Sequence, residues 1–287
     1  MQKGPKKEVQ PAQTQPHPGI EKDMNPQPKS QPERQNKRME NKILFITGGD
    51  SGIGKACALL FAQEGANVAI VYLNEHEDAK DTQKKIEKEF GKKCLLIPGD
   101  ITNEKFCIEA IEKTIKEYGK IDVLINNAAT QFESKRLEDI STEHLLITFQ
   151  TNIFSMFWIT KAALPHMKKG SSIINTTSVT AYRGSPELID YSSTKGAIVS
   201  FTRSLSTNLK EREIRVNAVA PGPVWTPLIV ASFDPKKVAE HGSDSPMKRA
   251  GEPSEIAPCY LFLANNEDSG YMSGQVLHPN GGEIVNG

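Results

Sequence analysis

The sequence predicts an α/β protein with a doubly wound parallel sheet, helices on both faces of that sheet, and a single domain. Three observations predict this class. Short β-branched runs alternate with longer helical runs from Lys42 onward, which is the order of repeated β-α units. The strand runs are continuously apolar, as strands covered on both faces are. A cluster of glycines stands directly between the first strand run and the first helical run.

The expected elements alternate along the chain, and each is assigned from its own run of residues. The strand runs read KILFIT, NVAIVY, CLLIPGD, DVLINN, SSIINTT, RVNAVAPG and GQVLHP, and begin at 42, 67, 94, 122, 171, 215 and 274. The expected helices are the longer segments between them, at 53–64, 75–90, 103–118, 142–168, 189–211 and 253–264. Parallel strands with right-handed crossovers place ligands at the carboxyl ends of the strands, so functional residues should follow strands.

Composition and charge exclude several function classes. Lysine plus arginine and aspartate plus glutamate balance at 35 each, so no basic excess indicates nucleic acid or an anionic membrane as a partner. No run approaches the length of a membrane span, and the N-terminus lacks the apolar stretch of a secretory signal. The histidines are scattered, and the cysteines are widely spaced, at 57, 94, 107 and 259. We therefore expect no disulfide framework, no metal site and a cytoplasmic location.

Residues 1–40 differ from the rest of the chain. They hold seven of the eighteen prolines and seven glutamines, and Val9 and Ile20 are their only branched aliphatics. Such a segment cannot bury enough apolar surface to offset the entropy lost on ordering. We expect residues 1–40 to be a proline/glutamine-rich arm, disordered or draped over an oligomer, and residues 41–287 to be the domain.

The glycine cluster TGGDSGIG, Thr47 to Gly54, has the context of a phosphate-binding loop. Glycines let the backbone approach a pyrophosphate, and the free N–H groups and the dipole of the following helix favour an anion. A flexible turn with no ligand is the alternative, but the strand before it and the helix after it favour a cofactor. A Walker loop needs serine or threonine after the lysine, and Gly54-Lys55-Ala56 lacks it.

The spacing G-x-x-x-G-x-G with Thr47 ahead of it resembles the short-chain dehydrogenase/reductase family. Further landmarks match in order over residues 42–287: Asp100, NNAA at 126–129, Asn152, Ser178, YSSTK at 191–195 and PGPVWT at 221–226. Ala129 departs from the family's usual glycine. The resemblance implies a Rossmann-type fold and an NAD(P)-dependent oxidoreductase that transfers a hydride between nicotinamide and a carbonyl or alcohol. The proline-rich arm resembles extensions on bacterial stress-associated members near the glucose-dehydrogenase-like branch.

The expected catalytic residues are Asn152, Ser178, Tyr191 and Lys195. Tyr191 and Lys195 are four apart on a predicted helix and share a face, and a nearby ammonium lowers the pKa of a phenol. The resemblance implies that Tyr191 transfers the proton, that Ser178 hydrogen-bonds the substrate oxygen, that Lys195 also binds ribose, and that Asn152 supports a proton relay. The alternatives are a surface pair for Tyr191 and Lys195, a turn-capping hydroxyl for Ser178 and a satisfied core amide for Asn152.

Cofactor contacts are expected at the ends of the strands, while Asn126 is expected to brace the central strands. The expected contacts are Gly48, Asp50, Ser51, Gly52, Ile53, Gly54, Tyr72, Leu73, Asn74, Asp100, Ile101, Asn127, Ala128, Ala129, Tyr191, Lys195, Pro221, Gly222, Val224 and Thr226.

The choice between NAD and NADP is expected to favour NAD. The segment VYLNEHEDAK after the second strand carries acidic residues at Glu75, Glu77 and Asp78, and Ser51 stands where many NADP-preferring relatives carry a basic residue. A 2′-phosphate would therefore face like charge.

Substrate choice and assembly are the remaining expectations. The long connection after Thr226 predicts a lid near 226–253 that selects a small-molecule carbonyl or alcohol substrate, together with Thr180, Tyr182 and Arg183. Relatives form tetramers through the helices that match 142–168 and 189–211, so a homotetramer is expected. Two rival functions are a catalytically silent nucleotide-binding sensor, which the intact catalytic set disfavours, and an enoyl reductase, whose tyrosine and lysine are further apart.

Overall fold

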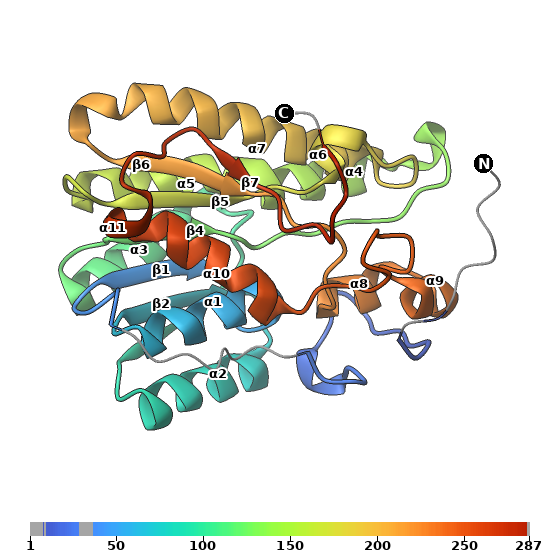
Figure 1. The fold of residues 1–287 in the computed structure, drawn as a ribbon, viewed down its shortest axis with the longest axis horizontal. Coiled ribbons are helices and arrows are strands. Elements are labelled where there is room, and N and C mark those ends of the chain that lie inside the picture. Colours follow the sequence, from blue (N-terminus) through green and yellow to red (C-terminus); the bar gives the residue numbers. More distant parts are fainter. Residues whose placement is uncertain (1–7, 9, 29–36, 286–287) are drawn as a thin grey trace.

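The computed structural model describes residues 8, 10–28 and 37–285, and its centre is one parallel sheet of seven strands (Figure 1). The strand order is β3-β2-β1-β4-β5-β6-β7. The order reverses between β1 and β4, which is where open α/β sheets form a crevice for ligands. The strands are β1 Ile43–Thr47, β2 Asn67–Tyr72, β3 Cys94–Pro98, β4 Val123–Asn126, β5 Ser172–Thr176, β6 Arg215–Val219 and β7 Val276–Leu277.

Alternate residues of the strands supply two apolar cores, one on each face of the sheet. Leu44 and Ile46 of β1 pack in one core with helices α1, α2 and α10, whereas Phe45 packs in the other with α3 and α5. The predicted α/β class, with helices on both faces, is confirmed. The helices are α1 Gly52–Gln63, α2 His76–Glu89, α3 Glu104–Tyr118, α4 Thr142–Phe149, α5 Ser155–Ala163, α6 Thr180–Arg183, α7 Ile189–Asn208, α8 Pro227–Ser232, α9 Pro235–Glu240, α10 Pro253–Ala264 and α11 Asn266–Ser269.

The predicted helix at 142–168 is interrupted. Helix α4 passes into a π-helical turn, Gln150–Phe154, before α5 begins, and a 3-10 turn, Leu164–His166, ends the segment. Apolar periodicity does not reveal such a turn, because buried polar residues also occur in the regular helices on either side of it, at Thr148 and Ser155. π-Helical turns occur frequently at functional sites, and this one carries Asn152.

Residues 10–28, which we call the N-terminal strap, lie against their own domain rather than apart from it (Figure 1). Met24 is buried in an apolar cluster with Trp225 and Val230, and the Trp225 indole donates a hydrogen bond of 2.7 Å to the Pro26 carbonyl. The low content of branched aliphatics did not reveal this arrangement. The contacts are made by Met24, by backbone groups and by the buried acid Glu21. The expectation for residues 1–7, 9 and 29–36 lies outside the described residues.

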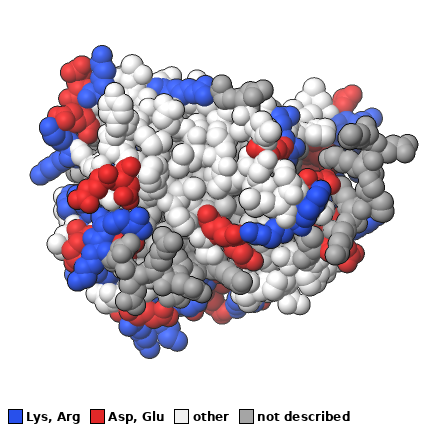
Figure 2. All heavy atoms as spheres, viewed as in Figure 1, with Lys and Arg blue, Asp and Glu red and all other residues white. Residues whose placement is uncertain are grey.

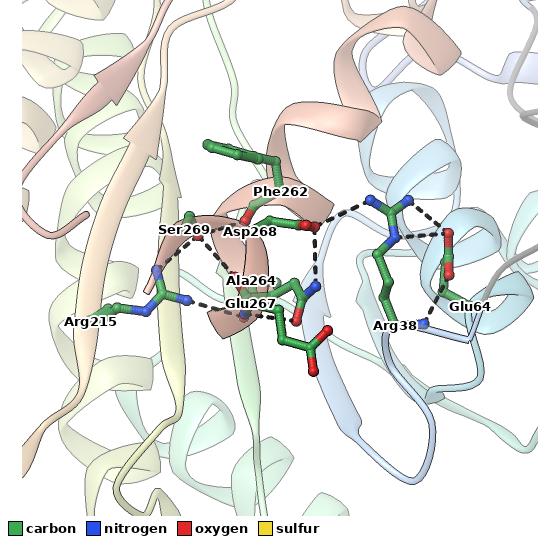
Figure 3. Close-up of polar contacts among 9 residues, drawn as sticks. Arg38, Glu64, Arg215, Phe262, Ala264, Glu267, Asp268 and Ser269 are labelled. Atoms are coloured by element: carbon green, nitrogen blue, oxygen red, sulfur yellow. Dashed lines mark hydrogen bonds and ion pairs between the residues drawn. The ribbon is translucent and has the colours of Figure 1, made fainter. Parts of the chain in front are cut away.

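The amino ends of the strands are fastened by two arginine networks (Figure 3). Arg38, just before β1, bonds the fully buried Glu64 at the end of α1 at 2.7 Å and also reaches Asp268 at 3.3 Å. Arg215 of β6 donates to the Ala264 carbonyl and the Ser269 hydroxyl, both at 3.2 Å. The first network joins α1 to α11, and the second joins α10 and α11 to the sheet.

Acidic and basic side chains are interspersed on the face drawn in Figure 2, and an uncharged area lies in its upper middle. Across the described part of the chain, no helix combines the length and apolar character that a membrane crossing needs. The same residues contain no group of three or more His, Cys, Asp or Glu side chains that could hold a metal ion. The four cysteines are free thiols, and burial raises the pKa of each of them.

Candidate active site

A cleft of about 460 Å³ opens where the carboxyl ends of the central strands meet. The turns after β1, β2, β3, β4, β5 and β6 all contribute to its lining. Helix α8 supplies Leu228 and Ile229, and the N-terminal strap supplies His17 to Gly19. The cleft therefore lies at the reversal of strand order.

The glycine turn after β1 brings the N-terminus of α1 to this cleft. Gly48 has a φ of +64°, and a Cβ at Gly54 would lie 1.8 Å from the Gly48 carbonyl oxygen. Glycine is thus required at both positions, the first for its dihedral and the second for close packing. The Thr47 hydroxyl accepts hydrogen bonds of 3.0 Å from the N–H groups of Asn127 and Ala128, which joins this turn to the one after β4.

The lining fits a dinucleotide. Backbone N–H groups at the start of a long helix suit a pyrophosphate, and a Cβ at Gly52 would lie 3.2 Å from the Thr226 methyl carbon, so glycine keeps the gap between α1 and Thr226 open. Apolar Val71 and Ile101 lie at the β2 and β3 side of the cleft.

Helix α7 presents Tyr191 and Lys195 to the cleft from one face. The Lys195 ammonium lies 5.2 Å from the centre of the Tyr191 ring and donates to the Thr176 carbonyl at 2.9 Å. Burial raises the pKa of Tyr191 to about 12, although a hydrogen bond with Ser178 opposes the rise, and burial lowers the pKa of Lys195 to about 7. The expected lowering of the tyrosine pKa is therefore wrong for the free protein, because loss of hydration dominates both groups.

Ser178 follows β5 and serves two neighbours. Its hydroxyl oxygen accepts a hydrogen bond of 3.2 Å from the Thr180 N–H, and its interaction with Tyr191 acts to lower the pKa of that phenol. Ser178 thus caps the turn after β5, as the alternative predicted, and also interacts with Tyr191.

Asn152 lies behind the cleft, fully buried, on the π-helical turn. Its side-chain oxygen accepts from the Thr130 N–H at 2.8 Å, and its amide donates to the Thr130 carbonyl at 2.9 Å and to the Thr194 hydroxyl at 3.1 Å. The side chain therefore joins the turn after β4 to α7, as a satisfied core amide does.

The chain matches the family model described as Enoyl-(Acyl carrier protein) reductase over residues 48–283. The chain belongs to the short-chain dehydrogenase/reductase family. It is 57% identical to the uncharacterized oxidoreductase YhxC of Bacillus subtilis (strain 168), over 98% of each chain. It is also 48% identical to the glucose and ribitol dehydrogenase of Daucus carota, over 96% of this chain and 97% of the other.

Solved structures agree with this membership. A short-chain dehydrogenase from Burkholderia cenocepacia J2315, in complex with NADP, has a TM-score of 0.80 and 28% identity, over 85% of this chain and 98% of the other. A 3-ketoacyl-(acyl-carrier-protein) reductase from Brucella melitensis, complexed with NADH, has a TM-score of 0.77 and 31% identity over the same shares, 85% and 98%. This short-chain dehydrogenase/reductase is thus an NAD(P)-dependent oxidoreductase acting on carbonyl or alcohol groups.

In this dehydrogenase/reductase nearly all the expected cofactor contacts line the cleft, and two do not. Gly54 packs behind the turn, against the Gly48 carbonyl. Asn74 is exposed, and its neighbour Glu75 lines the cleft instead. The residues that the cleft brings together are Gly48, Asp50, Ser51, Gly52, Ile53, Tyr72, Leu73, Asp100, Ile101, Asn127, Ala128, Ala129, Tyr191, Lys195, Pro221, Gly222, Val224 and Thr226.

Side chains expected to select substrate lie elsewhere. Tyr182 packs edge-on against His278 with ring centroids 4.7 Å apart, and Arg183 forms an ion pair of 2.8 Å with Glu283. Neither they nor Thr180 line the cleft. Asn126 braces the sheet as expected, since its amide donates to the Asn175 side chain on β5 at 2.9 Å.

Sequence reasoning missed several lining residues, of which two groups are instructive. Gln131 and Phe132 lie in the connection after β4, and the rule that functional residues follow strands could have found them. His17 to Gly19 precede the first strand by more than twenty residues. No strand, helix or motif in the sequence connects that stretch to the cleft.

Proposed function

We propose that this short-chain dehydrogenase/reductase uses Tyr191 as the proton donor and acceptor, with Ser178 hydrogen-bonded to the substrate oxygen. The observation that carries the proposal is that Tyr191, Ser178 and Lys195 line one cleft, with the Lys195 amine 5.2 Å from the centre of the tyrosine ring. When bound, the nicotinamide cofactor supplies or accepts the hydride.

The protonation states support carbonyl reduction. With a pKa of about 12, the Tyr191 hydroxyl keeps its proton at neutral pH and can donate it to a developing alkoxide. Lys195, held by the Thr176 carbonyl, is placed to hydrogen-bond a ribose hydroxyl. Asn152 acts in this scheme by fixing Thr130 relative to α7, which keeps the walls of the cleft in register.

Carbonyl chemistry is favoured over enoyl chemistry. Lys195 comes four positions after Tyr191, and both lie on one helix face, whereas enoyl reductases of the superfamily place these residues further apart. The relative from Daucus carota is called a glucose and ribitol dehydrogenase, so sugars and polyols are the first substrates to test.

The proposed cofactor site consists of the cleft residues named above, with NAD favoured over NADP. Asp50 and Glu75 line the cleft, and Asp50 is buried with a pKa raised to about 7, by burial first and by Glu75 second. Ser51 offers no cation to a 2′-phosphate, and carboxylates near that position disfavour a second anion.

Assembly and location extend the proposal. Several large apolar side chains of the α4–α5 segment are exposed in the single chain: Leu145, Leu146, Ile147, Phe154 and Phe157. Such a patch supports a homotetramer formed through this segment and α7. Four free thiols, three of them buried, support a cytoplasmic location. We also propose that residues 41–287 form the domain, with the lid at 226–253 built on α8 and α9.

Absorbance at 340 nm tests the function directly. The purified protein is assayed with NADH and NADPH against aldehydes, keto esters and sugars, and in reverse with polyols. We expect turnover on at least one carbonyl or polyol, and loss of that turnover in Tyr191→Phe. Full turnover in Tyr191→Phe would contradict the assigned role.

A further inference from the structure

The N-terminal strap forms one wall of the cleft and ties two of its sides together. His17, Pro18 and Gly19 line the cleft. At one end of this stretch, His17 packs on Phe132, which in turn stacks on His144 of α4, with ring centroids 5.3 and 4.2 Å apart. At the other end, Glu21 reaches helix α1.

Glu21 is fixed by an unusual set of buried contacts. Its carboxylate accepts a hydrogen bond of 2.6 Å from the Gly52 N–H, at the first residue of α1, and pairs with the Lys55 ammonium at 2.6 Å. Its own N–H donates to the Asp78 carboxylate of α2 at 2.9 Å. Glu21 and Lys55 are 3% and 5% exposed, so these contacts are protected from solvent.

Gly52 connects this contact to the proposed cofactor site. One side of Gly52 faces Glu21 of the strap through its N–H, and the other side faces Thr226 across the cleft. The Glu21 carboxylate therefore occupies the N–H of the first residue of α1, in the turn that we assign to the pyrophosphate.

Gly19 fixes the strap to the lid. A Cβ at Gly19 would lie 2.3 Å from the Pro227 carbonyl oxygen, so only glycine allows the strap to approach the start of α8 this closely. Beyond this point Gln15 donates its N–H to the Val230 carbonyl at 3.2 Å. The strap and α8 are therefore in direct contact at both Pro227 and Val230.

We propose that residues 15–28 are a cofactor-retaining element, in which His17 to Gly19 wall the dinucleotide into the cleft and Glu21 is the positioning residue that holds them there. The inference rests on the proposed function, because it takes the cleft to be the dinucleotide site. It assigns to the N-terminal strap a binding role for a nicotinamide dinucleotide, in addition to its packing role.

Two substitutions test the retaining element by different physical routes. Gly19→Ala displaces the strap from α8 by steric clash and changes no charge. Glu21→Ala removes the contact with Gly52 and the ion pair with Lys55. Lys22→Ala is the matched control, because Lys22 forms an ion pair with Glu77 in which both side chains are at least half exposed, and such pairs contribute little.

The readouts are the Kd of NADH from fluorescence titration and the NADH dissociation rate from stopped-flow displacement, with circular dichroism as the check on folding. We expect Gly19→Ala and Glu21→Ala to raise the Kd roughly tenfold, mainly through faster dissociation. Lys22→Ala should match the wild type. A strap that only stabilises the fold would lower the melting temperature and leave both NADH constants unchanged.

The two proposals fail in different ways. If wild-type protein binds NADH and both folded variants keep its Kd and dissociation rate within twofold, the retaining role is wrong and the proposed function stands. If the wild type binds neither NADH nor NADPH, the proposed function itself is wrong. If Glu21→Ala does not fold, the result for Gly19→Ala decides the matter alone.

Discussion

The two ends of helix α1 each meet a buried carboxylate, and they meet it in opposite ways. At the N-terminus, Glu21 accepts from the Gly52 N–H, where the helix dipole favours a negative charge. At the C-terminus, Glu64 caps the helix at 0% exposure, where the dipole disfavours that charge, and Arg38 compensates with hydrogen bonds of 2.7 and 3.2 Å (Figure 3).

The two ends of α1 therefore serve different purposes: the Glu21 end serves function, and the Glu64 end serves stability. The Glu21 end borders the cleft, and its neighbours Gly52 and Thr226 belong to the proposed cofactor site. The Glu64 end joins α1 to the chain before β1 and to α11. Substitutions at the cleft end should therefore change binding and turnover, and substitutions at the far end should change the free energy of unfolding.

The largest expected effect lies inside the cleft, at Tyr191 of α7. Tyr191→Phe removes the transferable proton but keeps the ring, so turnover should fall by roughly a hundredfold or more, the usual scale for a lost general acid. Cofactor Kd and melting temperature should match those of the wild type, by fluorescence titration and by thermal unfolding. A large loss of stability in this variant would mean that Tyr191 is needed for folding as well as for turnover.

At the far end, Arg38→Ala should lower the free energy of unfolding by about 3 kcal/mol, because it leaves Glu64 buried without its cation. Urea unfolding measures the change, and NADH binding to the folded protein should be unaffected. Lys93→Ala is the matched control, since Lys93 pairs with Glu117 on the surface at 3.3 Å. Equal losses in the two variants would contradict the assignment.

Lys195 should affect both activity and the pH dependence of the free energy of unfolding. Its pKa is about 7 in the folded, cofactor-free protein and near 10.5 when unfolded, so the unfolded chain binds more protons between these values. Stability should then rise with pH across that window, with a contribution of up to about 1.4 kcal/mol per pH unit. Lys195→Met should flatten this dependence in urea unfolding measured from pH 7 to 10, and should lose activity. An unchanged slope would show that Lys195 is charged in the free protein.

The smallest expected effect concerns the choice of cofactor at the cleft end. Fluorescence titration of wild type should give tighter binding of NADH than of NADPH by about threefold, because Asp50 and Glu75 face the site. Ser51→Arg should shift the ratio toward NADPH. Tighter NADPH binding by the wild type would show that backbone groups or other cations neutralise the 2′-phosphate.

The sequence predicted most of what lies at strand ends. Alternating runs identified the seven strands, and motif order located Ser178, Tyr191 and Lys195 in one cleft. These features depend on local periodicity and on short spacings, which a sequence displays directly. The pKa of Tyr191 was missed, because it depends on burial from every side of the cleft rather than on the neighbour four residues away.

The N-terminal strap shows where sequence reasoning ends. Its contacts join residues far apart in the chain, such as Trp225 with Pro26 and Glu21 with Asp78. A proline-rich composition indicates low apolar content, yet a few backbone bonds, one buried methionine and one buried acid hold this stretch in place. Likewise, spacing could not show that Asn152 lies on a π-helical turn.

The buried thiols have a consequence for chemical resistance. Peroxides and alkylating reagents attack thiolate rather than thiol, and burial raises the pKa of Cys57, Cys94, Cys107 and Cys259. None of the four lines the cleft. If Tyr191 is the proton donor, as proposed, the reaction needs no thiolate, and the enzyme should keep working in an oxidised cell, when enzymes that rely on a catalytic cysteine have stopped.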